Sequence, residues 1–80
     1  MALVHLPADL ALYADGLSQV EADGARVVDV FRALVRRYPR LEGRLDQMAV
    51  AIDGEIYQDA DYRPVRPESE LHLVPPIQGG

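Results

Sequence analysis

The 80-residue chain contains no cysteine and no lysine, so all eight of its basic residues are arginine. The absence of cysteine excludes a disulfide framework, a thiolate nucleophile, iron–sulfur ligation and any zinc site built on cysteine. No apolar run approaches the roughly 18–20 residues that a membrane-spanning helix needs, and residues 1–6 lack the basic segment that opens a secretory signal. We therefore expect a soluble cytoplasmic protein without a membrane partner.

Positive charge is also scarce, because eight bases stand against 13 acidic residues and the net charge is −5. This sign is wrong for a protein that binds nucleic acid. Serine, threonine and cysteine nucleophiles are limited to Ser18 and Ser69, neither of which lies in a G-x-S-x-G motif, and the glycines form no phosphate-binding loop. We expect one small domain that is not an enzyme by itself and binds no nucleic acid and no cofactor.

An amphipathic helix is the clearest element in the sequence. Between residues 27 and 38, large apolar side chains recur at the spacing of one helical face: Val27, Val30, Phe31, Leu34, Val35 and Tyr38. Pro39 is expected to end this helix, whereas Arg26 is a poor residue for capping its first turn. The same segment gathers five arginines, which form either a solvated helix face or a docking patch for an acidic partner: Arg32, Arg36, Arg37, Arg40 and Arg44.

Five short segments have the character of β-strands: residues 2–6, 17–22, 48–52, 55–57 and 70–74. The Asp53-Gly54 pair is a strong signal for a tight hairpin turn, and residues 7–14 are expected to form a loop or a turn of helix. The order of two strands, a helix and three strands indicates an α+β fold, in which the helix packs across one face of a mixed sheet.

The carboxyl end of the sequence has an unusual composition. After the last predicted strand come Pro75, Pro76, Ile77, Gln78, Gly79 and Gly80. Proline favours an extended backbone at the first two positions, and six extended residues reach about 20 Å. The two glycines have no Cβ, so they can enter a channel too narrow for other residues. This geometry suits chemistry on the carboxylate of Gly80, and a tail without function is the alternative.

Residues 70–80, with the sequence ELHLVPPIQGG, resemble the carboxyl end of the MoaD/ThiS family of ubiquitin-like sulfur carriers. The small subunit of molybdopterin synthase is the most similar type, because its chains end in a strand, Pro-Pro, an aliphatic residue, any residue and Gly-Gly. Residues 6–16 resemble the family's first strand and the turn that follows it, and residues 24–34 resemble the entry into its single helix. The resemblance implies a β-grasp (ubiquitin-like) domain over residues 1–74 and a flexible, extended tail over residues 75–80.

The resemblance also implies how the tail works. An adenylating enzyme of the ubiquitin-activating type would use ATP to join the Gly80 carboxylate to AMP, and a sulfur donor would convert the adenylate to a thiocarboxylate. A large synthase subunit, or another sulfur-accepting enzyme, would take the sulfur into molybdopterin for the molybdenum cofactor. These partners would recognise the rest of the tail, and no cysteine or lysine of the chain itself could intercept the activated group.

A β-grasp sheet has its first and last strands side by side and parallel, which places the two histidines. If the helix covers the alternate residues of both strands, His5 and His72 lie together on the open face. With their neighbours they form the predicted partner interface: Leu3, His5, Ala49, Ala51, His72 and Val74. Two histidines without a third ligand make a poor metal site, and Asp59 and Asp61 lack the rest of a calcium loop, so no metal is expected.

Other functions remain compatible with the sequence. The sulfur can go instead to thiamin, cysteine or a specialised metabolite. Gly80 can be joined to lysines of other proteins, as in a ubiquitin-like protein modifier. The chain can also be a β-grasp interaction module with an inert tail. Independently of these functions, the two histidines can be ordinary surface residues, and the lack of lysine can reflect coding bias.

Overall fold

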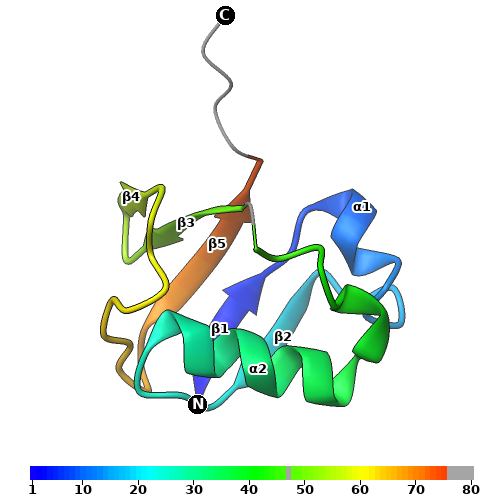
Figure 1. The fold of residues 1–80 in the computed structure, drawn as a ribbon, viewed down its shortest axis with the longest axis horizontal. Coiled ribbons are helices and arrows are strands. Elements are labelled where there is room, and N and C mark those ends of the chain that lie inside the picture. Colours follow the sequence, from blue (N-terminus) through cyan, green and yellow to red (C-terminus); the bar gives the residue numbers. More distant parts are fainter. Residues whose placement is uncertain (47, 76–80) are drawn as a thin grey trace, which may run out of the picture.

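In the computed structural model, which describes residues 1–46 and 48–75, five strands form one mixed sheet with a helix across one face (Figure 1). The elements in chain order are β1 (Ala2–His5), α1 (Ala8–Ala11), β2 (Gln19–Ala22), α2 (Val27–Arg37), the 3-10 helix η1 (Pro39–Leu41), β3 (Ala49–Ile52), β4 (Glu55–Tyr57) and β5 (Glu70–Val74). The strand order is β2-β1-β5-β3-β4. Strands β1 and β5 are parallel, and the other neighbouring pairs are antiparallel. The predicted α+β, β-grasp architecture is confirmed.

The hairpin between β3 and β4 closes with the two-residue turn that the sequence predicted. Ile52 pairs with Glu55, so only Asp53 and Gly54 lie between the strands, with φ angles of +48° and +94°. Positive φ at both central residues is the pattern that matches the right-handed twist of a hairpin, and Asp-Gly adopts it readily. The turn therefore fixes which residues of β4 face each side of the sheet.

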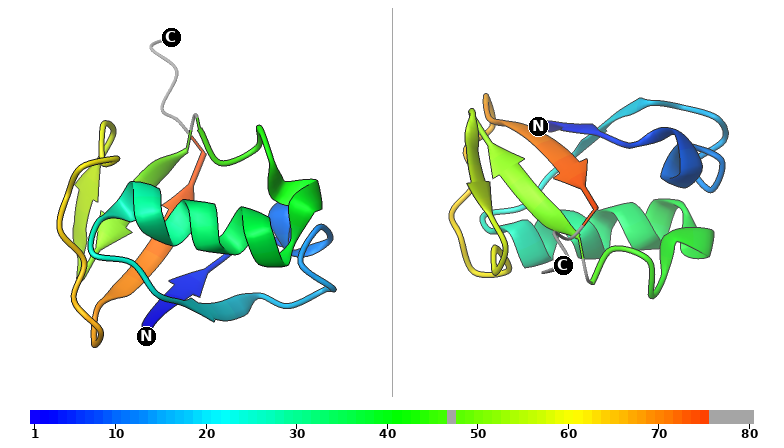
Figure 2. Two further views of the ribbon diagram at one scale, coloured as in Figure 1. Left: turned by 60° about the horizontal axis from the view of Figure 1, so that its bottom comes forward. Right: turned by 90° about the horizontal axis from the view of Figure 1, so that it is seen from above.

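The core lies between α2 and one face of the sheet. The buried side chains of α2 are Val27, Val30, Phe31 and Leu34. They belong to one cluster with the inward-facing residues of the strands: Val4, Val20, Val50, Leu71 and Leu73. The views in Figure 2 show α2 lying along this face, and within the described residues no helix covers the opposite face. One side of the sheet is therefore left for contact with solvent or a partner.

The first turn of α2 is satisfied by a distant loop rather than by its own cap residue. Arg26 makes no side-chain capping bond, as the sequence led us to expect. Instead, the N–H groups of Val27 and Val28 donate to the carbonyl oxygens of Arg63 and Asp61, at 3.1 and 2.8 Å. The loop after β4 thus supplies acceptors for these free helical N–H groups through the backbone carbonyls of Asp61 and Arg63.

Within the described ranges, neither helix nor 3-10 turn has the length and apolarity needed to cross a lipid bilayer. The strands agree with the predicted segments, although β1, β2 and β3 are each one or two residues shorter. Residues 8–11 form the short helix α1, one of the two forms expected for that segment. Pro75 follows β5 and is exposed, at the boundary predicted between domain and tail.

Candidate functional site

The uncovered side of the sheet, called here the open face, carries a continuous cross-strand row of side chains. Strand pairing aligns His5 with Gln19 on one side and with His72 on the other. His72 is aligned in turn with Ala51, and Ala51 with Ile56. Because side chains alternate along a strand, all five residues of this row point to the same side. The row crosses all five strands through the middle of the sheet.

The two histidines of this row lie in direct contact, as the parallel arrangement of the first and last strands led us to expect. Their imidazole rings are stacked, with centroids 4.0 Å apart and an angle of 3° between the ring planes. Nε2 of His5 lies 2.9 Å from Oε1 of Glu70, two residues before His72 on β5. The His5 side chain is more enclosed than that of Glu70, with 21% exposed against 57%.

The structure brings most of the predicted interface residues together on the open face. Leu3, Ala51 and Val74 are half-buried there, beside the histidine pair. Ala49 also points to this side, because it pairs with Val74, but only 2% of it is exposed. The expectation that Ala49 is exposed on this face is therefore wrong. Its side chain is a single methyl group, which is too short to reach past the neighbouring side chains to solvent. Whether the face binds a partner stays a prediction.

The open face also contains residues that were not predicted from the sequence, and two of them, Ile56 and Glu70, bear on its function. Ile56 is 60% exposed and extends the apolar part of the surface onto β4. Its signal was the Asp53-Gly54 turn, because a two-residue loop aligns Ile56 with Ala51. Glu70 is the second, and its signal was the spacing of two residues from His72 on one strand, which puts both side chains on the same side.

Glu70 also bears on metal binding at the open face. No metal site was expected from the sequence, because the two histidines had no third ligand. In the structure His5, Glu70 and His72 each offer a ligand atom, and all these atoms lie within 4.8 Å of one another. The premise of a missing ligand is therefore wrong, because parallel pairing places β5 alongside β1 and brings the carboxylate to the ring pair.

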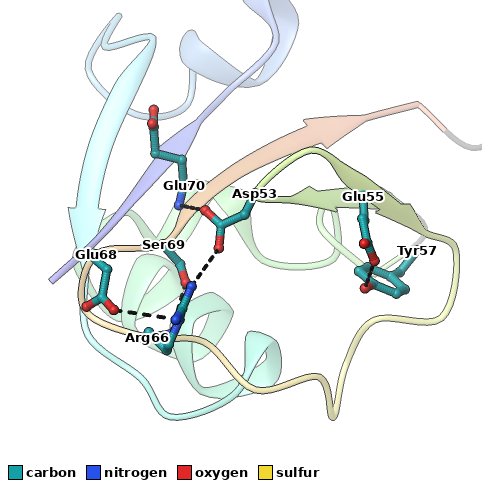
Figure 3. A network of polar contacts seen from close by, with 7 residues as sticks. All are labelled: Asp53, Glu55, Tyr57, Arg66, Glu68, Ser69 and Glu70. Atoms are coloured by element: carbon teal, nitrogen blue, oxygen red, sulfur yellow. Dashed lines mark hydrogen bonds and ion pairs between the residues drawn. The ribbon is translucent and has the colours of Figure 1, made fainter.

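A polar network holds the backbone of Glu70 in place (Figure 3). The Glu70 N–H donates to Oδ1 of Asp53 at 3.0 Å, and the Asp53 N–H donates to the Glu70 carbonyl oxygen at 3.0 Å. Arg66 lies on the same carboxylate, with Nη2 3.9 Å from Oδ2. Ser69, one of the two possible nucleophiles, is buried and its Oγ accepts the Arg66 N–H at 3.0 Å, so its role is structural.

The Tyr57 phenol donates to Oε2 of Glu55 at 2.6 Å (Figure 3). This hydrogen bond to a carboxylate, helped by desolvation and by the negative charge of Glu55, raises the pKa of Tyr57 above its ordinary value. The guanidinium of Arg63 lies 4.2 Å from the ring centroid and acts in the opposite direction on the pKa. The pair lies on β4, on the core side of the sheet, and is not part of the open face.

Three of the five clustered arginines pack against tyrosine rings. The guanidinium carbons of Arg40 and Arg44 lie 5.0 and 4.0 Å from the ring centroid of Tyr13, and that of Arg37 lies 5.4 Å from the centroid of Tyr38. Such cation–π contacts stabilise surface side chains by about 0.5–1 kcal/mol each. They give these arginines a structural role without an acidic partner.

The predicted reactive end of the chain is only partly within the structure. Pro75 is described, and it leaves the sheet directly after Val74 at the end of β5. The other predicted tail residues lie outside the described residues: Pro76, Ile77, Gln78, Gly79 and Gly80. Their assignment therefore rests on the sequence and on the comparisons with known proteins.

Residues 4–80 match the ThiS family. The chain belongs to the ThiS family. This confirms the MoaD/ThiS resemblance seen in the sequence, and the match extends through residue 80, so it includes the Pro-Pro and Gly-Gly segment. No curated protein matches the chain.

Solved structures of several ubiquitin-like proteins have the same fold. CysO in the Amycolatopsis orientalis BexX/CysO complex is 22% identical, with a TM-score of 0.87 and full coverage of both chains. Mycobacterium tuberculosis CysO is 16% identical, with a TM-score of 0.86 over 96% of this chain and 100% of that one. Small archaeal modifier protein 1 from Haloferax volcanii is 35% identical, with a TM-score of 0.68 over 99% of this chain and 98% of that one. The ThiS-family chain thus has the fold of ubiquitin-like sulfur carriers and modifiers.

Proposed function

We propose that this ThiS-family chain is a sulfur carrier whose reactive group is the carboxylate of Gly80. The observation that supports the proposal is the family match that runs through residue 80. It includes a segment in which two prolines follow the central strand β5 and two glycines end the sequence. Such a segment can project a carboxylate from the domain into a narrow active site of another protein.

The chemistry begins with activation, because a carboxylate is a poor electrophile. An adenylating partner enzyme joins a Gly80 carboxylate oxygen to the α-phosphate of ATP, and pyrophosphate leaves. A persulfide sulfur of a donor protein then attacks the acyl carbon, and AMP leaves. A thiol of the donor breaks the sulfur–sulfur bond, so that the donor is oxidised to a disulfide and Gly80 keeps a thiocarboxylate. The carrier supplies the reacting atom, and the partners supply the acid–base groups.

The open face is the proposed docking surface for the adenylating enzyme. Its apolar side chains from four strands surround the histidine pair: Leu3, Ala51, Ile56 and Val74. A patch of this kind, central and rimmed by the polar residues Gln19, Glu21 and Glu70, is typical of a protein–protein contact. It lies at the strand from which the tail departs, so docking here brings the tail to the partner's active site.

The product that receives the sulfur from Gly80 has several candidates. The sequence predicts molybdopterin, whereas the CysO and small archaeal modifier relatives favour cysteine or protein modification. The similarity to small archaeal modifier protein 1 from Haloferax volcanii, at 35% identity over 99% of the chain, supports modification as a second candidate function. In that case the activated Gly80 carboxylate is transferred to a lysine amine of another protein.

Intact-mass analysis of the chain isolated from its host tests both candidates. A carrier shows a species heavier by the mass difference between sulfur and oxygen, and a modifier shows high-mass adducts in which the carboxyl end of this chain is joined to a lysine of another protein. Removal of Gly79 and Gly80 abolishes either species, whereas Glu42→Gln, in an exposed loop, leaves both unchanged. The proposal would be overturned if removal of the two glycines impaired no sulfur-dependent pathway and eliminated no conjugate.

A further inference from the structure

We infer that His5, His72 and Glu70 form a binding site for a divalent transition-metal ion, with Zn²⁺ as the ion that fits best. The three side chains offer two imidazole nitrogens and one carboxylate oxygen, all within 4.8 Å of one another. Two Zn–N bonds of about 2.0–2.1 Å span at most about 4.2 Å. The two imidazole rings are stacked, so the lone pairs of their nitrogens lie in nearly parallel planes. Both rings must turn about their side-chain bonds before the three donors converge on one ion, while the paired backbones of β1 and β5 keep their positions.

The scaffold of this site is rigid and belongs to the middle of the sheet. His5 lies on β1 and the other two on β5, which are adjacent in the strand order and paired in parallel. Glu70 and His72 are two residues apart on one strand, so they point to the same side. Glu70 is held further by the reciprocal backbone hydrogen bonds with Asp53. A site built on paired central strands loses little freedom when it binds an ion.

The donor set selects the class of ion. Imidazole nitrogen is a good ligand for Zn²⁺, Cu²⁺ and Ni²⁺, whereas Ca²⁺ and Mg²⁺ prefer sites made of oxygen. Two histidines and one glutamate make a set of three ligands that Zn²⁺ accepts with a fourth position open to water. The histidines and Glu70 are reachable from solvent, because the open face is covered by no helix of the described chain.

The electrostatic surroundings favour a cation. All eight arginines lie outside the five strands, so no strand side chain of the open face carries a fixed positive charge. The carboxylate of Glu21 lies on the same face, in the row that joins Leu3 to Glu70. The net charge of the chain is −5, which raises the local concentration of cations at the surface.

The proposed metal site lies within the proposed docking surface. His5 and His72 stand in the middle of the row from Gln19 to Ile56, at the centre of the proposed docking surface. A bound ion there presents its fourth coordination position outward, toward whatever protein covers the face. The metal site itself depends only on the described side chains, so it stands or falls independently of the sulfur-carrier function.

Calorimetric titration of the full chain with ZnCl₂ tests the site. We expect saturable binding of one ion per chain. Zn²⁺ affinity should fall at least about tenfold in each of three variants, His5→Ala, His72→Ala and Glu70→Gln. Tenfold is the smallest loss of metal affinity typical when a residue that only supports a ligand is removed, so loss of a ligand itself should cost at least this much. Glu21→Gln is the matched control, because it removes one negative charge from the same face outside the triad, and it should leave the affinity within about twofold.

Two further measurements distinguish coordination of the ion by the three side chains from nonspecific electrostatic attraction of the ion to the negatively charged surface. Co²⁺ in place of Zn²⁺ should give the visible absorption of a coordinated ion, and Glu70→Gln should reduce it. Zn²⁺ at about 100 times its dissociation constant should raise the Tm by at least about 5 °C, and His72→Ala should abolish that shift while circular dichroism shows an intact fold. Absence of one-to-one binding, or equal loss in Glu21→Gln and Glu70→Gln, would overturn the inference.

Discussion

His5 and His72 come from opposite ends of the sequence, yet their imidazole rings stack with centroids 4.0 Å apart and an angle of 3° between them. The contact exists because β1 and β5 pair in parallel in a register that sets the two residues side by side. It lies at the centre of the open face, beside Glu70, and it connects the proposed docking surface with the proposed metal site.

The exposed isoleucine on β4 provides a test of docking. Ile56→Asp places a charge on the apolar part of the open face, and burial of an unpaired charge in an interface is unfavourable. We expect affinity for the adenylating enzyme to fall at least about tenfold, or about 1.4 kcal/mol. Leu12→Asp is the matched control, since Leu12 is 71% exposed and lies at the end of α1, away from the open face. Equal affinities of the two variants, measured by calorimetry, would argue against docking by this face.

The Asp53 carboxylate should contribute measurably to stability. Asp53→Ala removes the acceptor of the Glu70 N–H and places alanine at φ +48°, so we expect a loss of about 1–3 kcal/mol in the free energy of unfolding. Asp53→Asn keeps an acceptor oxygen and tolerates positive φ. It gives up only an exposed ion pair to Arg66, which contributes about 0–1 kcal/mol. Urea denaturation of both variants checks the difference, and equal losses would show that the hydrogen bond is unimportant.

The phenol of Tyr57 should titrate at a higher pH than usual. Its hydrogen bond to Glu55 raises its pKa in the folded protein, so it favours folding while the phenol is protonated. This contribution is complete below the unfolded-state value of about 10 and is lost as pH rises through the higher folded-state value. Glu55→Ala should move the pKa of Tyr57 back toward its ordinary value, as followed by NMR of the Tyr57 ring. Glu68→Ala, an exposed acid elsewhere, should leave the titration of Tyr57 unchanged.

Gly24, in the segment that leads into α2, should not accept a side chain. A Cβ at this position would lie 2.5 Å from the Val30 nitrogen and 2.9 Å from the Asp29 carbonyl carbon. These are backbone atoms of the helix and cannot move aside. We expect Gly24→Ala to cost about 1–3 kcal/mol, the range typical of overpacking, in thermal or urea denaturation. A change of less than about 0.5 kcal/mol, the usual size of a surface effect, would contradict this close approach of the two segments.

Much of the fold was predictable from local patterns. The apolar spacing from Val27 to Leu34 predicted α2, and Asp53-Gly54 predicted the hairpin, because each signal depends only on neighbouring residues and backbone preferences. The placement of the histidines was also correct, but it needed the resemblance to a β-grasp fold to say which strands pair. The capping of α2 by the Asp61 and Arg63 carbonyls was not predictable, because neither position carries a capping signature in the sequence.

The candidate sites divide in the same way. The sequence by itself determined the features that do not depend on folding. These are the absence of cysteine and lysine, the negative net charge, and the Pro-Pro and Gly-Gly segment that supports Gly80 as the reactive end. Only the tertiary structure decided that Glu70 joins the two histidines, that Ile56 extends the open face and that Ala49 is buried within it. The reason is physical, since alternation along a strand sets the side to which a residue points, whereas its neighbours depend on the order and register of strands far apart in sequence.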